Sequence, residues 1–140
     1  YGRGPFENYI DRYSSSFIGR YNDKVENQFY WYIRPQETGN KTDVRWLSLL
    51  DNKGQGVKIT GLQPIAFSAL HFSPEDLDPG LTRKMQHTID IIPQKNIFLH
   101  IDLKQRGLGG DNSWGMYPHN EYRLLDKKYS YSYMIELIDQ

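Results

Sequence analysis

The most distinctive residue types in this 140-residue chain occur in the run GLGGDNSWG, residues 107–115. Four of its nine residues are glycines, which accept backbone angles closed to other residues and so favour one tight loop shape. The short polar side chains that follow can hydrogen-bond to nearby backbone and hold that shape. Such a loop presents one flat ring, Trp114, and the apolar face of a sugar is a natural partner for it. The residues predicted to shape the loop are Gly107, Gly109, Gly110, Asp111 and Ser113.

Two other interpretations of this loop compete with sugar binding. In the first, Trp114 is a plug in the core and the glycines beside it avoid clashes; residue spacing leaves this one open. In the second, the loop binds phosphate, which requires a lysine and the start of a helix after the glycines. Neither follows this run, so we reject the phosphate interpretation.

The carboxylates of the chain do not form an evident catalytic pair. Glycoside hydrolysis needs two carboxyl groups roughly 5–10 Å apart across a cleft. Glu75, Asp76 and Asp78 cluster on a short predicted helix, where capping and solubility explain them. Glu7 and Asp11 are close in sequence and could face one another, yet nothing marks them as a pair. The chain also lacks a G-x-S-x-G motif. We therefore assign it no catalytic residue.

Metal and thiol chemistry find no support in the sequence. There is no cysteine. The four histidines, His71, His87, His100 and His119, lie far apart without the spacing typical of metal ligands. His100 falls on the more polar face of its predicted strand, which favours a solvent-facing or packed side chain. We assign no metal-binding residue.

A second distinctive run, YGRGPFENYIDR, opens the chain at residues 1–12. Two glycines and a proline fix a loop, and a cluster of Arg, Glu, Asn, Asp and Tyr follows. Such a mixture is typical of a buried polar network that braces a fold, or of direct contact with a ligand, and both interpretations stay open. Because the run starts at Tyr1 without an initiator methionine or a signal segment, we expect the chain to be part of a longer protein.

Short strands must position these two runs. Alternating apolar residues predict strands over residues 28–33, 44–50, 57–60, 66–72, 97–104 and 129–138. The segment 51–56 (DNKGQG) predicts a tight turn between two of them. One short helix is predicted after Ser73, with Pro74 at its first position and Asp78, Pro79 and Gly80 at its end. Together these elements predict a single all-β domain over residues 1–140, an antiparallel β-sandwich with long loops.

The charge balance excludes two classes of partner. Seventeen basic and seventeen acidic side chains cancel, so nothing favours nucleic acid or an anionic membrane. No stretch approaches the roughly 20 apolar residues needed to span a bilayer. The absence of cysteine fits reducing and oxidising compartments alike.

In their order and separation, residues 1–12 and 107–115 resemble two motifs in the last domain of the large bacterial β-galactosidases of glycoside hydrolase family two, the small-chain type. The segments DVRWLSLL (43–50) and FSALHFSPEDL (67–77) and the region of His87 and Thr88 are also similar. The resemblance covers nearly the whole chain. It implies the C-terminal part of a β-supersandwich of the galactose-mutarotase-like type.

The resemblance also implies a division of labour within a longer enzyme that hydrolyses terminal β-D-galactosides such as lactose. The two catalytic glutamates of that family come from a preceding TIM-barrel domain of the same polypeptide, which this chain lacks. Its Mg²⁺ and Na⁺ are bound in other domains, so no cofactor is expected here. Trp114 matches the tryptophan of a GGD-x-SW motif that reaches into the barrel as an apolar platform for the sugar. Asp111 and Ser113 match positions that shape the loop, whereas Asn112 stands where an acid is common.

The same resemblance leads us to expect a homo-oligomer, in either the bacterial cytoplasm or the periplasm. Because the family's domain has more strands before the segment at Tyr1, sheet edges and apolar faces should be uncovered here. We therefore expect the isolated chain to associate with itself or to be only marginally stable. Two other functions stay open: a stand-alone carbohydrate-binding module, and a mutarotase-like enzyme with an acid and a base in one cleft.

Overall fold

The computed structural model describes residues 1–78, 80–81 and 86–139 of the chain. In chain order its elements are strands β1 (Gly2–Gly4) and β2 (Phe17–Gly19), the 3-10 helix η1 (Val25–Gln28), strands β3 (Lys41–Leu50) and β4 (Gly56–Leu70), helix α1 (Pro74–Leu77), the 3-10 helix η2 (Thr88–Asp90), strand β5 (Phe98–Asp102), the 3-10 helix η3 (Asn120–Tyr122) and strand β6 (Tyr133–Ile138). The strand pairs described are all antiparallel. The predicted all-β, antiparallel class is confirmed, and the arrangement agrees with a β-sandwich.

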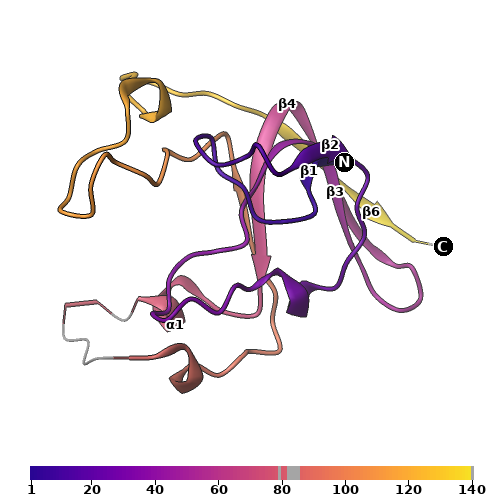
Figure 1. The fold of residues 1–140 in the computed structure, drawn as a ribbon. Coiled ribbons are helices and arrows are strands. Elements are labelled where there is room, and N and C mark those ends of the chain that lie inside the picture. The colour runs from indigo at the N-terminus through magenta and orange to yellow at the C-terminus, as the bar shows by residue number, and fades with distance from the viewer. Residues whose placement is uncertain (79, 82–85, 140) are drawn as a thin grey trace.

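Strand β4 is the centre of a four-stranded sheet (Figure 1). β3 pairs along both halves of β4, so β5 and β6 share the other edge, one beside each half. The segments predicted as separate strands at 57–60 and 66–72 are thus parts of one strand. Pro64 fits within it because the register with β3 shifts between Val44 and Trp46. A proline, which has no N–H to donate, is tolerated where such an irregularity interrupts the ladder.

Local sequence signals set the β3–β4 turn and helix α1, as predicted. Asp51 accepts hydrogen bonds from the backbone of Lys53 and Gln55, and Gly54 takes the positive φ of 81° that the turn requires. At α1, the Ser73 hydroxyl accepts from the Asp76 N–H, while the Asp76 carboxylate accepts from the Ser73 N–H. This capping box closes the helix start. Of the residues predicted to end the helix, Pro79 lies outside the described ranges.

The strand predicted over residues 28–33 is wrong. Its first residue ends η1, and the rest of the segment is irregular. Its apolar residues serve packing instead. Phe29 is buried with Leu70 and Phe72, and its ring contacts the ring of Trp31 edge-on. Alternation alone could not separate this aromatic anchor from a strand.

The buried apolar residues form two clusters. One joins the 28–33 segment to the end of β4 and helix α1: Phe29, Leu70, Phe72, Leu77 and Ile91. The other lies on the sheet: Val44, Leu47, Ile59 and Ile65, with Phe67, Leu99 and Ile101 packed beside it. Because successive side chains of a strand point to opposite faces, Phe67 and Leu70 of β4 lie on opposite faces of the sheet.

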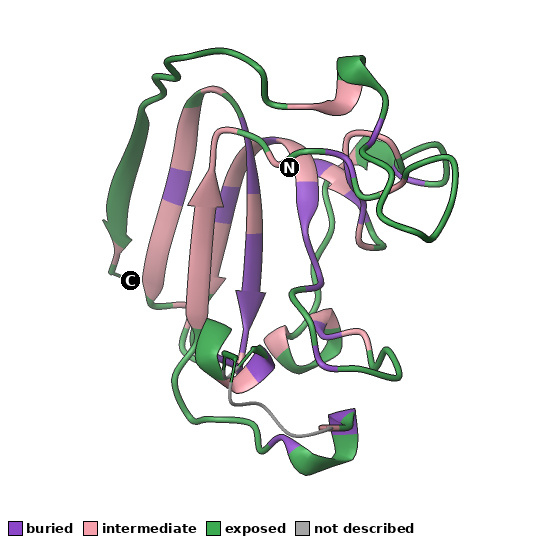
Figure 2. Cartoon of the chain, turned by 90° about the vertical axis from the view of Figure 1, so that its left-hand side faces the viewer, coloured by how far each residue is buried: buried purple, intermediate pink, exposed green. Residues whose placement is uncertain are grey.

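The second cluster continues into β6, where it is uncovered. Ile135 is paired with the buried Ile59, and Leu137 with Val57, so these residues share one face. Ile135 is 60% exposed and Leu137 79% exposed. Figure 2 shows β6 as an exposed strand at the C-terminal end of the chain. The expected uncovered apolar face is therefore present.

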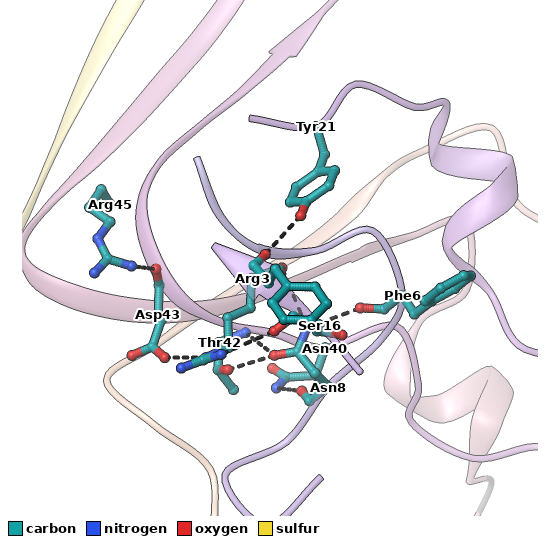
Figure 3. Close-up of polar contacts among 10 residues, drawn as sticks. Arg3, Phe6, Asn8, Ser16, Tyr21, Asn40, Thr42, Asp43 and Arg45 are labelled. Carbon is teal, nitrogen blue, oxygen red and sulfur yellow. Dashed lines mark hydrogen bonds and ion pairs between the residues drawn. The ribbon is translucent and has the colours of Figure 1, made fainter. Parts of the chain in front are cut away.

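The opening run is tied to β3 by a polar network (Figure 3). The Asn8 side chain donates to the carbonyl of Phe6, and its Oδ1 accepts from the N–H and hydroxyl of Thr42. The Asn40 side chain donates to the Asn8 carbonyl, and Arg3 forms an ion pair with Asp43 at 2.5 Å. Asn8 and Asn40 are buried. These contacts show the bracing role for much of the opening run.

Candidate functional site

The two end motifs meet at the base of the 107–115 loop. Gly107 donates its N–H to the Tyr122 carbonyl, 2.6 Å away, which closes the loop on itself. Gly109 donates its N–H to a carboxylate oxygen of Asp11 at 2.9 Å, so the opening run also braces the loop. In Figure 1 the orange segment after β5 projects away from the sheet. Asp11 and Gly109 are 98 positions apart, so residue spacing gives no sign that the two runs meet.

The glycines of the loop serve mainly close approach rather than unusual backbone angles. Of the four, Gly115 takes a positive φ, 98°. A Cβ on Gly110 would lie 2.2 Å from the Met116 carbonyl oxygen, and one on Gly107 would lie 2.8 Å from the Tyr122 Cβ. A Cβ on Gly109 would meet the far end of the Arg12 guanidinium at 2.8 Å. The expectation that backbone angles demand these glycines therefore holds for Gly115. Close packing explains Gly107 and Gly110, whereas the contact at Gly109 is with the movable end of a side chain.

The tip of the loop displays Trp114. Asn112 turns the chain by accepting the Trp114 N–H on its side-chain oxygen at 2.9 Å. Trp114 is 92% exposed. The interpretation of Trp114 as a core plug is therefore wrong for this chain. Ser113, which the sequence placed among the loop-shaping residues, is also exposed at the tip.

A side-chain pair crosses the loop just below its tip. Asp111 Oδ1 lies 2.7 Å from His119 Nε2. This hydrogen bond, and the charge of the same carboxylate, raise the pKa of His119 above its ordinary value. Both side chains are largely exposed. Their separation of eight positions, with a turn between them, is the signal in the sequence that could have linked the two residues.

Glu7, considered in the sequence as one half of an acid pair with Asp11, is a structural hub. Its carboxylate accepts hydrogen bonds from the Thr38 hydroxyl at 2.7 Å and the Gly39 N–H at 2.8 Å, and from the Tyr32 hydroxyl. The bond to Glu7 raises the pKa of Tyr32 to about 12. Burial, followed by the charge of Glu7, raises the pKa of Tyr9 well above its ordinary value. Glu7 thus ties the opening run to residues 32–39, while Asp11 serves the loop.

A His–Glu contact lies elsewhere on the molecule. His100 Nδ1 is 4.0 Å from Glu37 Oε1, and both line a cavity of about 390 Å³ with Arg34, Ser68 and Phe98. The Gln105 amide donates to the same Glu37 oxygen at 2.7 Å. His100 is neither fully buried nor fully exposed. Of the four histidines, His100 is thus placed beside a carboxylate inside a cavity, which the sequence did not indicate.

The described ranges contain neither a cluster of metal ligands nor a membrane-spanning helix. Among residues 1–78, 80–81 and 86–139, no three His, Cys, Asp or Glu side chains gather as metal ligands would. Within that same part of the chain, no helix has the length and apolar character needed to cross a membrane.

Fold and loop together define an antiparallel all-β domain that displays an aromatic side chain on a braced glycine loop. Comparison with known proteins shows which family this chain resembles. A family model described as beta galactosidase small chain matches residues 1–135. The β-galactosidase of Priestia megaterium is 38% identical over 124 residues, which are 89% of this chain and 12% of that protein. The β-galactosidase of Streptococcus thermophilus is 33% identical over 138 residues, 97% of this chain and 13% of that protein.

The chain belongs to the β-galactosidase small-chain family. This confirms the resemblance seen in its two end motifs. BgaC, a β-galactosidase of Bifidobacterium adolescentis, is a further relative, 35% identical over 127 residues. The chain spans 12 or 13% of the length of the relatives named here.

Proposed function

We propose that this chain is the C-terminal accessory part of a β-galactosidase and that it contributes Trp114 as an aromatic platform for the sugar. The observation that carries the proposal is the 92% exposure of Trp114 at the tip of a loop braced from two sides. Because the loop that holds the ring is braced, the ring meets a partner surface with little further cost in ordering. The relatives named β-galactosidase support the reaction class.

The proposed catalytic carboxylates lie on a TIM barrel of the same polypeptide. Most of each relative lies outside the part that matches this chain, which leaves room for such a domain. Glu7 and Asp11, the acids of the opening run, already serve as hydrogen-bond acceptors for the fold. This chain then orients the substrate, while proton transfer and nucleophilic attack fall to the barrel.

The platform acts by apolar contact between the indole ring and the sugar. The indole face lies against the C–H groups of one sugar face, which removes apolar area of both from water. An interaction made equally in the ground state and the transition state lowers KM without changing kcat. We therefore expect Trp114 to act on KM first.

The test is Trp114→Ala in the complete β-galactosidase polypeptide, assayed with lactose. Loss of roughly 1 kcal/mol of aromatic contact raises KM about fivefold, with kcat largely retained. Trp114→Phe keeps a ring and should recover most of the wild-type KM. Met116→Ala, an exposed neighbour on the same loop, is the matched control. Unchanged KM and kcat in Trp114→Ala would overturn the platform.

A stand-alone carbohydrate-binding module is a competing function. It requires the isolated chain to bind galactose without a barrel. Titration calorimetry of the isolated chain with galactose separates the two functions, because the accessory role predicts negligible heat. Binding that disappears in Trp114→Ala would favour the module.

A mutarotase-like activity is favoured by one observation, the His100–Glu37 contact inside a cavity. Such an activity needs an acid and a base at one site. Polarimetry of α-galactose with the isolated chain tests it, with His100→Gln as the matched variant. The accessory role predicts that neither protein accelerates the change in rotation.

A further inference from the structure

We propose that His119 is a positioning residue for Trp114, and that its pair with Asp111 makes the placement of the ring depend on pH. The inference rests on the proposed function, because it concerns the same platform. The loop has two legs on either side of the turn that carries Trp114. The first leg is residues 107–111, and Asp11 binds it through the Gly109 N–H. The second leg is residues 116–122, and it ends at Tyr122, whose carbonyl accepts the Gly107 N–H.

The two legs approach each other in successive layers. At the base, the Gly107 N–H is bonded to the Tyr122 carbonyl. Higher up, Gly110 lies so close to the Met116 carbonyl that no Cβ fits between them. Asp111 then reaches across to His119 at 2.7 Å, and the next residue, Asn112, holds the Trp114 N–H. The Asp111–His119 bond is therefore the side-chain tie adjacent to the turn that carries the ring.

Contacts within the second leg hold the backbone at His119 in place. His119 immediately precedes η3, and its carbonyl accepts the Tyr122 N–H at 2.9 Å. The Arg123 guanidinium lies 4.7 Å from the centre of the Tyr117 ring and also donates to the Asn120 side chain. An imidazole on this leg can hold the Asp111 carboxylate of the first leg just before the turn that carries Trp114.

Protonation of His119 changes the strength of this tie. The imidazolium donates from both ring nitrogens, and its bond to a carboxylate is charge-assisted. In the described chain, the charged groups that bear on His119 are Asp111 and, more weakly, Glu121, both of which favour the protonated form. The tie is therefore strongest at low pH and weakens as pH rises through the pKa of His119, above the ordinary value of about 6.5.

The experiment follows Trp114 directly and does not depend on activity alone. The complete polypeptide is labelled with 5-fluorotryptophan, and the Trp114 fluorine resonance is identified by its absence in Trp114→Phe. Its line width is followed from pH 5.5 to 9, together with KM for lactose. In the wild type we expect the line to narrow, and KM to rise several-fold relative to its low-pH value, across one midpoint above 6.5.

Variants of His119 and Asp111 separate the effect of the charge on His119 from the effect of its hydrogen bond. His119→Gln retains a donor that does not titrate, so the line width and KM should be independent of pH over this step. His119→Ala should show the narrow line and raised KM at every pH. Asp111→Asn should move the midpoint down toward 6.5. His87→Gln changes an exposed histidine outside this loop and should behave as the wild type.

Two outcomes overturn the inference: a wild-type step that persists in His119→Gln, or a line width in His119→Ala at pH 5.5 equal to that of the wild type at the same pH. Failure of the proposed function looks different. In that case the resonance responds to pH as expected, while KM stays constant in all these variants and in Trp114→Ala.

Discussion

At the scale of single residues, contact with rigid backbone separates the glycines of the loop. A Cβ on Gly110 would meet the carbonyl oxygen of Met116 at 2.2 Å, and backbone cannot move aside cheaply. A Cβ on Gly109 would meet the end of the Arg12 side chain, which can rotate away, and its next contact, at 3.5 Å to Asp11, is ordinary. The sequence predicts the same role for both glycines, whereas the structure predicts that a side chain is tolerated far better at Gly109 than at Gly110.

This ranking gives a prediction for the complete polypeptide. Gly110→Ala should raise KM about as much as Trp114→Ala, roughly fivefold, because the second leg must shift and carry the ring with it. Gly109→Ala is the matched control and should change KM by less than about twofold, since its N–H still reaches Asp11. Steady-state kinetics with lactose measures both. Equal effects of the two substitutions would contradict the close-approach account.

At the scale of elements, the start of β3 contains a buried charge. Lys41 is 6% exposed, and its Nζ donates to the Gln28 side chain at 3.0 Å and to the Gly39 carbonyl at 3.1 Å. Burial lowers the pKa of Lys41 to about 8. The unfolded chain, whose lysine titrates near 10.4, therefore binds more protons than the folded one between these values, and stability rises with pH in this window.

Lys41→Met removes the titrating group, so the unfolding free energy of the wild type is compared with that of this variant at each pH. The free energy of unfolding of the wild type should gain about 3 kcal/mol from about pH 7 to about pH 11 relative to Lys41→Met. Below about pH 7, where the cost of burying the charge is fully present, the difference should be constant. Urea unfolding at a series of pH values measures it. Parallel pH profiles for the two proteins would show that Lys41 does not titrate in this range.

Elements set by local chemistry were predictable from the sequence, and those set by distant partners were not. The turn at Asp51 and the cap at Ser73 are determined within five residues, and both are confirmed. Phe29, in contrast, takes its place from Leu70 and Phe72, so its segment was misjudged as a strand. The candidate site divides in the same way. The loop was visible in its residue types, whereas its tie to Asp11 requires the fold.

At the scale of the whole molecule, the open apolar face on β6 governs association. Exposed strands with an apolar face are prone to pair with other chains. We predict that the isolated chain elutes as a dimer or larger species in size-exclusion chromatography and that Leu137→Lys shifts it toward the monomer. Ile89→Lys, at a position that is 88% exposed but on η2, should not. A clean, cooperatively unfolding monomer of the wild-type chain would contradict this prediction.

The closure of the loop at Gly107 and Tyr122 has a consequence for protein engineering. Because the N–H and carbonyl that join them are only 2.6 Å apart, residues 108–121 leave and re-enter the domain at nearly one point. A short link between Gly107 and Tyr122 can therefore replace the excursion without pulling on β5 or β6. The cost is the Gly109–Asp11 hydrogen bond, so an exchange of residues 108–121 between relatives needs an acceptor at position 11 in the receiving chain.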